Sequence, residues 1–236
     1  MSTKWPKVLP PLTAEQQRIS DEFMRAWHEE LPQRYSIVER FNHGFPVAVS
    51  DFPFVSTLEI GAGLGEHLRY ENLTAEQLRN YTAVDVRENM IAALRSAFPQ
   101  IRALQADAQQ RMDVTGDSID RILAIHVLEH LPNLPAAVDE LYRVCAKPSG
   151  RLIVVIPCEG GLAYSLARKI SAERFYRRRF GGSYRWLYSR EHINLPNEVI
   201  AELRRRFSVE RTQYFPLPLM PLTTANLCIG LRLKPQ

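Results

Sequence analysis

Short apolar runs alternate with amphipathic stretches through the middle of the chain. Runs with the length of buried strands lie at about 55–60, 81–86, 101–106, 120–126 and 150–157. Helical patterns separate most of them, at about 64–70, 88–97 and 133–146. Parallel strands need long connections, which usually form helices, so this alternation predicts a parallel sheet built from right-handed crossovers.

Two helical patterns precede the first strand. A capping box at Thr13 predicts a helix over about 14–30. Pro32 suits the first turn of a second helix over about 32–42, and Gly44 suits its C-terminal end. We interpret this part of the chain as a helical collar or lid.

The alternation breaks after Pro157. A basic, aromatic-rich segment at about 160–190 precedes a helical pattern at about 196–206. Two strand-like runs follow, at about 207–215 and 225–233. We expect no independent second domain. The predicted organisation is an N-terminal collar, a main α/β domain and an insertion over the substrate side, at residues 1–53, 54–236 and about 160–190.

Composition excludes several classes of protein. The chain has 236 residues, 45% of them hydrophobic, which is ordinary for a globular protein. No apolar run approaches the roughly 20 residues that span a bilayer, and the N-terminus lacks a signal-peptide pattern. The separated cysteines Cys145, Cys158 and Cys228 favour neither disulfides nor a zinc cluster, so we expect a reducing, cytoplasmic location.

Positive charge is concentrated in the insertion. The formal net charge is +4, and between Arg168 and Arg190 only Glu173 opposes the basic residues. Such a zone attracts anions, although the same run is also typical of a solvated helix face. Aromatic residues interleave with it and either line an acceptor pocket or pack the insertion itself: Phe175, Tyr176, Tyr184, Trp186 and Tyr188.

A glycine loop follows the first strand. It reads Gly61-Ala62-Gly63-Leu64-Gly65, and glycine permits both a sharp turn and close approach of a ligand to the backbone. The dinucleotide fingerprint requires glycine at the position of Glu66. A carboxylate at this position would repel the negative charge of a pyrophosphate. It is compatible with S-adenosylmethionine (SAM), which has no phosphate. Glu59, just before the loop, is a candidate for binding the ammonium of such a ligand.

Asp85 ends the second strand, 20 residues after Gly65. In doubly wound sheets an acid at this position accepts hydrogen bonds from the ribose hydroxyls of an adenosine ligand. Asp85 therefore fits SAM or NAD, and a helix-capping role is the structural alternative.

These motifs together resemble those of the class I SAM-dependent methyltransferases, in particular the subfamily similar to ubiquinone-pathway enzymes. The resemblance covers about 55–157 and includes the glycine loop, Val84-Asp85, Ala106-Asp107-Ala108, residues 125–131 and Lys147-Pro148-Ser149-Gly150. It implies an α/β, Rossmann-like fold with a mostly parallel seven-stranded sheet, an antiparallel last strand and helices on both faces. Ser149 replaces a family glycine, and we expect Gly150 to supply the positive φ of that turn.

The resemblance also implies roles for single residues, with SAM as the cofactor. Asp85, followed by Val86, would hold the ribose. Asp107 would accept a hydrogen bond from the adenine amine, and the backbone N–H of Ala108 would donate a hydrogen bond to the adenine ring. His126 would face the methyl donor and the acceptor.

Histidines supply the candidate catalytic groups. Methyl transfer from a sulfonium is an in-line displacement that depends on alignment, and a hydroxyl acceptor also needs a general base. His126 and His192 are our candidates, although His192 also suits a surface helix cap. His126, Glu129 and His130 would share one face of a helix. Some relatives bind a divalent metal here with a glutamate at the position of His126, so we expect no metal.

The acceptor is open at this level. We favour a small molecule, a sugar or a lipid-linked glycan over RNA, because no RNA-binding module is recognisable and the net charge is modest. Peripheral membrane contact is compatible with the sequence, which does not indicate an oligomeric state. A SAM-binding regulator without catalysis, an RNA methyltransferase and an NAD-type oxidoreductase are the alternatives.

Overall fold

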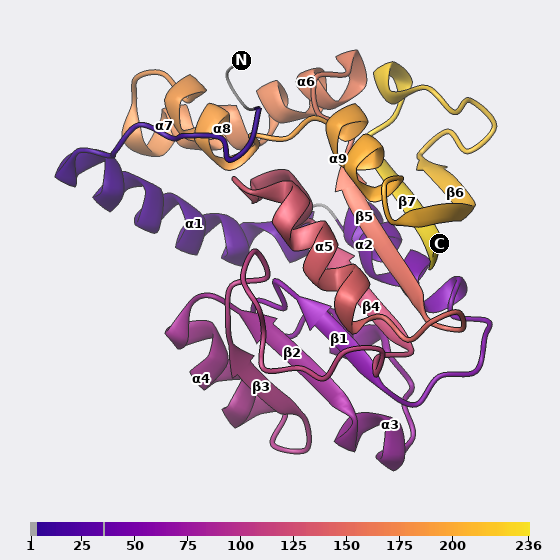
Figure 1. The fold of residues 1–236 in the computed structure, drawn as a ribbon. Coiled ribbons are helices and arrows are strands. Elements are labelled where there is room, and N and C mark those ends of the chain that lie inside the picture. Colours follow the sequence, from indigo (N-terminus) through magenta and orange to yellow (C-terminus); the bar gives the residue numbers. More distant parts are fainter. Residues whose placement is uncertain (1–3, 35) are drawn as a thin grey trace.

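The computed structural model describes residues 4–34 and 36–236. Seven strands form one sheet in the order β3-β2-β1-β4-β5-β7-β6 (Figure 1). The strands are β1 (Thr57–Ile60), β2 (Tyr81–Asp85), β3 (Arg102–Gln105), β4 (Arg121–Ile125), β5 (Arg151–Pro157), β6 (Phe207–Phe215) and β7 (Cys228–Pro235). The first five run parallel, whereas β7 pairs antiparallel with both β5 and β6. The expected seven-stranded sheet with an antiparallel last strand is confirmed.

Helices surround the sheet. The α-helices of the described residues are α1 (Ala14–Arg34), α2 (Ser36–Ala48), α3 (Ala75–Arg79), α4 (Glu88–Ala97), α5 (Leu134–Val144), α6 (Leu162–Ile170), α7 (Ala172–Phe180), α8 (Arg185–Glu191) and α9 (Pro196–Leu203). Three short 3-10 turns are η1 (His67–Tyr70), η2 (Leu128–His130) and η3 (Thr223–Ala225). The predicted helix at about 64–70 is therefore a 3-10 turn, and α3 was not predicted.

Alternate residues of the central strands bury opposite faces of the sheet, because successive side chains of a strand point to opposite sides. Ile122 and Leu152 pack in the cluster that includes α5 and α9. Leu123 and Ile153 pack with Phe45 of α2 in a separate cluster. Strands buried on both faces are typical of parallel sheets, so the predicted helices on both faces are confirmed.

Two predictions about the second helix were wrong. Helix α1 continues through Pro32 to Arg34, and α2 continues through Gly44 and Pro46 to Ala48. A glycine inside a helix costs only about 1 kcal/mol relative to alanine. The aromatic rings that α2 buries against the sheet, including Phe45, outweigh that cost.

The prediction for Gly150 was also wrong. Gly150 is not among the residues of positive φ. A Cβ at this position would lie 2.6 Å from the carbonyl oxygen of Ala146 and 2.9 Å from Cys145 Sγ. Close packing, rather than a left-handed backbone, therefore requires glycine here.

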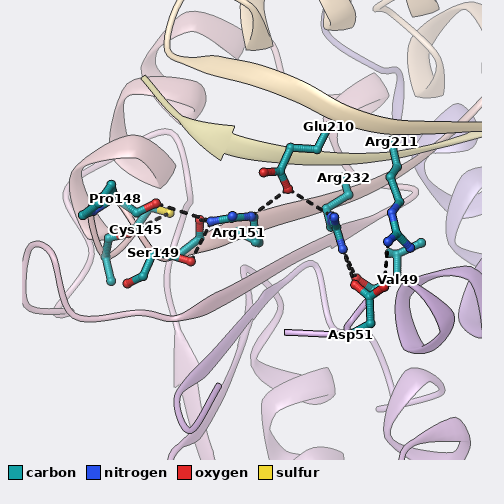
Figure 2. A network of polar contacts seen from close by, with 11 residues as sticks. Val49, Asp51, Cys145, Pro148, Ser149, Arg151, Glu210, Arg211 and Arg232 are labelled. Atoms are coloured by element: carbon teal, nitrogen blue, oxygen red, sulfur yellow. Dashed lines mark hydrogen bonds and ion pairs between the residues drawn. The ribbon is translucent and has the colours of Figure 1, made fainter. Parts of the chain in front are cut away.

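An ion-pair network ties the antiparallel edge to the rest of the sheet (Figure 2). Glu210 lies at a register shift between β6 and β7. Its carboxylate accepts from Arg151 Nε of β5 at 2.7 Å and forms an ion pair with Arg232 Nε of β7 at 3.1 Å. Asp51, which follows α2, pairs with Arg232 and with Arg211. Three strands and the segment after α2 are thereby joined through charged side chains.

Candidate active site

The glycine loop turns from the carboxyl end of β1 towards η1. Gly61, Gly63 and Gly65 have φ values of 64°, 55° and 79°, which residues with a Cβ rarely adopt. A Cβ on Gly61 would lie 2.7 Å from Val127 Cγ2, and one on Gly65 would lie 2.6 Å from Phe98 Cε2. Backbone conformation and close packing therefore both require these two glycines.

Two carboxylates accept hydrogen bonds from backbone N–H groups of this loop. The backbone N–H of Gly63 donates to Asp85 Oδ2 at 3.2 Å, and that of Leu64 donates to Glu66 Oε2 at 3.1 Å. A Cβ on Gly63 would lie 3.2 Å from the same Glu66 oxygen. The Glu66 carboxylate thus takes up an N–H group that a phosphate would use, and its charge would repel one. The loop therefore fits a ligand without a pyrophosphate.

Asp85 ends β2, and Val86 follows it directly. Asp85 is 4% exposed, and its Oδ1 accepts from the backbone N–H of Arg87 at 2.9 Å and from Arg87 Nε at 3.2 Å. Val86 is apolar yet 58% exposed. An uncovered apolar side chain beside a fixed carboxylate suits a ligand that combines an aromatic ring with a hydroxylated sugar.

Asp107 and Ala108 follow β3 at the same edge of the sheet. Asp107 Oδ1 accepts from the backbone N–H and from Nε2 of Gln109, at 2.9 and 3.0 Å. Ala108 is buried, and its backbone N–H donates to no acceptor within the described part of the chain. That free donor suits the ring of a bound adenine.

Glu59 is a buried member of the predicted site, and it is 4% exposed. Its side chain is buried in β1, and its Oε2 accepts from the hydroxyl of Tyr81 at 2.6 Å. Burial raises the pKa of Glu59, while His67 and the Tyr81 hydroxyl act in the opposite direction. Its role towards an ammonium group stays a prediction.

His126 directly follows β4 in a left-handed backbone conformation, with φ of 50°. The next turn is the 3-10 turn η2, so His126 does not share an α-helix with Glu129. Its Nδ1 lies 3.2 Å from Glu129 Oε1, and its Nε2 lies 4.0 Å from Cys228 Sγ. Burial opposes a charged imidazole, but the contacts with Cys228 and Glu129 outweigh it and raise the pKa of His126 to about 10.

Glu129 is the buried centre of this cluster. It is 1% exposed, and its Oε1 also lies 3.8 Å from His130 Nε2. Burial disfavours the carboxylate, but the hydrogen bond with His126 and the charges of the neighbouring histidines lower the pKa of Glu129 to about 2. Glu129 is therefore an ionised group that orients the two imidazoles.

His192 enters from the end of the insertion and reaches the same cluster. Its Nδ1 lies 2.9 Å from the buried Glu159 Oε2. The ring centroids of His130 and His192 are 5.0 Å apart, and the ring of Tyr188 stacks on His192 at 5.7 Å. Two histidine–carboxylate pairs from distant segments therefore lie side by side.

Sequence reasoning missed several members of this cluster. Glu159, Cys228 and Tyr164, whose ring centroid lies 6.3 Å from that of His192, carry no local motif. His130 was considered only as a metal ligand. Its Nδ1 is hydrogen-bonded to the carbonyl oxygen of Glu191, and burial together with His192 lowers the pKa of His130 against the influence of Glu129.

Most aromatic residues of the insertion lie elsewhere. They pack against one another and against α1, in a cluster that includes Phe23, Phe175, Tyr176, Tyr184 and Trp186. Trp186 Nε1 donates to the hydroxyl of Tyr176 at 3.1 Å. The packing interpretation thus holds for these rings, whereas Tyr188 also contacts His192.

Within residues 4–34 and 36–236, no three His, Cys, Asp or Glu side chains are grouped so that they could hold a metal ion. In the same part of the chain, no helix combines the length and the apolar character needed to cross a membrane.

Comparison with known proteins agrees with this geometry. Residues 58–154 match the model of a family described as a methyltransferase domain. No curated protein sequence is similar enough to match the chain. Because 58–154 carries the glycine loop, Asp85, Asp107 and His126, the matched family segment is the one that builds the site.

Solved structures show the same fold at low sequence identity. A SAM-dependent methyltransferase from Thermotoga maritima has a TM-score of 0.64 and 17% identity, over 92% of this chain and 98% of that one. The N-methyltransferase NodS from Bradyrhizobium japonicum, in complex with S-adenosylhomocysteine (SAH), has a TM-score of 0.60 and 16% identity, over 93% and 97%. A Burkholderia thailandensis 1,6-didemethyltoxoflavin-N1-methyltransferase, with that compound and SAH bound, has a TM-score of 0.59 and 17% identity, over 98% and 94%.

The fold and the matched segment define a class of protein. The chain has the fold of the class I SAM-dependent methyltransferases, and its residues 58–154 match the model of a methyltransferase-domain family. Its cofactor is S-adenosylmethionine.

Proposed function

We propose that the protein transfers the methyl group of SAM to a small molecule, a sugar or a lipid-linked glycan. The observation that carries this proposal is the pair of histidine–carboxylate contacts, His126–Glu129 and His192–Glu159, at 3.2 and 2.9 Å. The first of them follows β4 directly, at the sheet edge that also carries the glycine loop. Polar groups suited to moving a proton are therefore available next to a cofactor site.

The placement of the predicted residues supports the following binding roles. Asp85 would accept from the ribose hydroxyls, while Asp107 and the backbone N–H of Ala108 would hold the adenine. Glu59 would attract the ammonium, directly or through water. When bound, the cofactor supplies a methyl group on a sulfonium, a leaving group that needs no acid. The protein's main contribution is to align the acceptor behind that methyl group.

The three histidines differ as general bases. With its raised pKa, His126 is protonated at neutral pH and would have to lose a proton first, a loss that a bound cation favours. His130 has a lowered pKa and stays neutral at that pH. We therefore add His130 to His126 and His192 as a candidate base.

A solved structure of similar fold and the basic insertion both support the proposed acceptor class. The toxoflavin-type methyltransferase of similar fold acts on a small molecule, which supports a small acceptor here. The resemblance to ubiquinone-pathway enzymes stays a prediction from the motifs, as does a cytoplasmic location from the cysteine pattern. The basic insertion suits an acceptor with a phosphate or carboxylate group.

Two measurements test the proposal. The first is the shift in melting temperature with SAH and with NAD, since a ligand at about 100 times its Kd stabilises the folded state by about 2.7 kcal/mol. We expect a shift with SAH and none with NAD. The reverse result would contradict the cofactor site.

The second measurement is transfer of radiolabelled methyl from SAM to panels of small-molecule, glycolipid and RNA acceptors. We expect label in one of the first two panels. SAH binding without transfer to any panel would favour a non-catalytic regulator, and label in RNA alone would favour the RNA methyltransferase alternative.

A further inference from the structure

One end of the molecule carries an uncovered apolar stripe. Leu162, Leu166 and Ile170 of α6 are 78%, 62% and 66% exposed. Their spacing of four residues places them on one face of that helix. An exposed apolar row of this kind on a folded protein usually marks a surface that meets a partner or a membrane.

The connection between β6 and β7 extends the stripe. This loop presents the exposed side chains Leu217, Leu219, Met220 and Leu222, and Leu219 is 99% exposed. It leads into η3, which packs against α6. Figure 1 shows α6 and this connection side by side at the end of the molecule that also carries α7. Together they form one surface, which we call the α6–loop surface.

Basic side chains border the α6–loop surface. Lys169, Arg174, Arg177 and Arg178 line one shallow hollow together with Ile170 and Glu173. Glu173 is paired with Arg177 at 2.6 Å. Lys169, Arg174 and Arg178 have no ion-pair partner within the part of the chain that the structure describes.

An apolar helix face bordered by basic side chains favours one kind of binding partner. A helix with an apolar face and Lys and Arg beside it lies in a membrane interface, with its apolar side chains among the acyl chains and its cations at anionic headgroups. The long basic side chains reach the headgroups while their methylene stems cover apolar surface. A soluble polyanion would use the cations but would leave seven apolar side chains in water.

We propose that the α6–loop surface docks the protein on an anionic lipid bilayer. The α6 part of this surface lies on the insertion that precedes His192, so docking would bring the acceptor site close to amphiphilic molecules in the membrane. The docking itself depends only on the exposed side chains and not on methyl transfer. The two proposals can therefore fail independently.

The test is co-sedimentation with vesicles of phosphatidylcholine alone and of equimolar phosphatidylcholine and phosphatidylglycerol. We expect binding to the anionic vesicles, at least about tenfold weaker partitioning to the neutral ones, and weakening by added salt. Failure to bind either vesicle would overturn the proposal.

One double variant and a control locate the apolar part of the binding surface. Leu166→Ser with Ile170→Ser should weaken partitioning at least about tenfold, because two apolar side chains no longer enter the interface. The apolar control is Ile37→Ser on α2, which is 68% exposed and should bind like the wild type. Equal losses in both would overturn the assignment of the surface.

Charge reversal tests the basic border. Arg174→Glu with Arg178→Glu should weaken partitioning at least about tenfold. The control, Arg79→Glu with Arg95→Glu, makes the same charge change on α3 and α4, at the opposite end of the view in Figure 1. All variants should keep the melting shift with SAH, which reports an intact fold. A control that loses as much binding as the test variant would contradict the proposal.

Two other outcomes would replace the lipid surface. Binding of a single-stranded RNA oligomer without vesicle binding would identify a nucleic-acid surface. A wild-type dimer in light scattering, made monomeric by Leu166→Ser with Ile170→Ser and without vesicle binding, would identify an interface between two copies of the chain. Either result would overturn the proposal.

Discussion

Asp85 is held in place before any ligand arrives. Its carboxylate accepts from the backbone N–H groups of Gly63 and Arg87, at 3.2 and 2.9 Å. Two bonds from the main chain fix the oxygens at the end of β2, and Arg87 contributes a side chain that is 44% exposed. A preorganised acceptor of this kind binds hydroxyl groups with little loss of side-chain entropy.

Asp85→Ala should weaken SAH binding while the fold survives. A hydrogen bond to a charged group contributes about 1.5–3 kcal/mol, or about 10- to 100-fold in Kd. Isothermal titration measures the affinity, and urea unfolding confirms the fold. Asp113→Ala, whose side chain is 88% exposed, is the control. Unchanged affinity in Asp85→Ala would overturn the ribose assignment.

The pH dependence of kcat should identify the general base. A base works in its deprotonated form, so the rate rises with pH through its pKa in the complex and then levels off. With His126 as the base, whose pKa is about 10 in the free protein, kcat should still rise above neutral pH. With His130, whose pKa is lowered from its usual value, kcat should level off before neutral pH.

Substitution of each histidine in turn should identify the residue that causes the pH dependence of kcat. His126→Gln and His130→Gln should each keep SAH affinity within a few-fold, and only the substitution of the base should lower kcat strongly and remove the rise. His192→Gln extends the comparison to the second histidine–carboxylate pair. Wild-type kcat in all three variants would exclude histidine base catalysis.

The bounds of a helix or strand could be predicted from the sequence where the segment had a clear hydrophobic period and a clear end signal. The predicted bounds of α4 and β6 agree with those observed. A capping box between Thr74 and Gln77 was present in the sequence as a signal for α3 and was not used. Helix α2 could not be bounded from sequence, because Gly44 reads locally as an end.

In the candidate site, too, some contacts could be predicted from the sequence and others could not. His126 and Glu129 were predicted together because they are neighbours in sequence. The contacts of His192 with Glu159 and of His126 with Cys228 depend on how α8 and β7 meet the sheet. No periodicity within a segment reports that arrangement, so these contacts were not predicted.

Removal of the Glu210 carboxylate should destabilise the antiparallel edge. Its side chain is 19% exposed and serves arginines of two strands (Figure 2). Glu210→Ala should lower the free energy of unfolding in urea by about 1.5–3 kcal/mol. Asp139→Ala, which breaks a pair with both partners over 40% exposed, should change it by less than about 1 kcal/mol. Equal losses would contradict a specific role for the network.

The contact between α2 and β7 predicts opposite changes in stability for two glycine-to-alanine substitutions. A Cβ on Gly230 would lie 2.6 Å from the ring of Phe45, whereas one on Gly44 meets nothing within 4 Å. Gly230→Ala should therefore destabilise by about 1–3 kcal/mol through overpacking. Gly44→Ala should stabilise by about 0.5–1 kcal/mol, since alanine favours a helix interior. Urea unfolding measures both, and the same sign in the two variants would contradict the packing argument.

At the scale of the whole molecule, the two N-terminal helices differ in how they join the rest of the protein. Phe23 of α1 packs on Tyr176 and Tyr184 of the insertion. Helix α2 packs instead on the central sheet, in the cluster that contains Phe45 and Val155. The division of the chain after residue 53 stays a prediction, and this difference provides a test of it.

Two truncations separate the contributions of these helices. Removal of residues 1–34 takes away α1 and should lower the melting temperature while leaving a cooperative transition and the SAH shift. Removal of residues 1–53 also uncovers Ile153 and Val155 of the sheet, which α2 otherwise buries. Because large exposed apolar surfaces favour aggregation, we expect this shorter chain to lose its cooperative melting transition. If it instead melts cooperatively and shifts with SAH, residues 54–236 form a complete domain and α2 is a collar around it rather than part of its core.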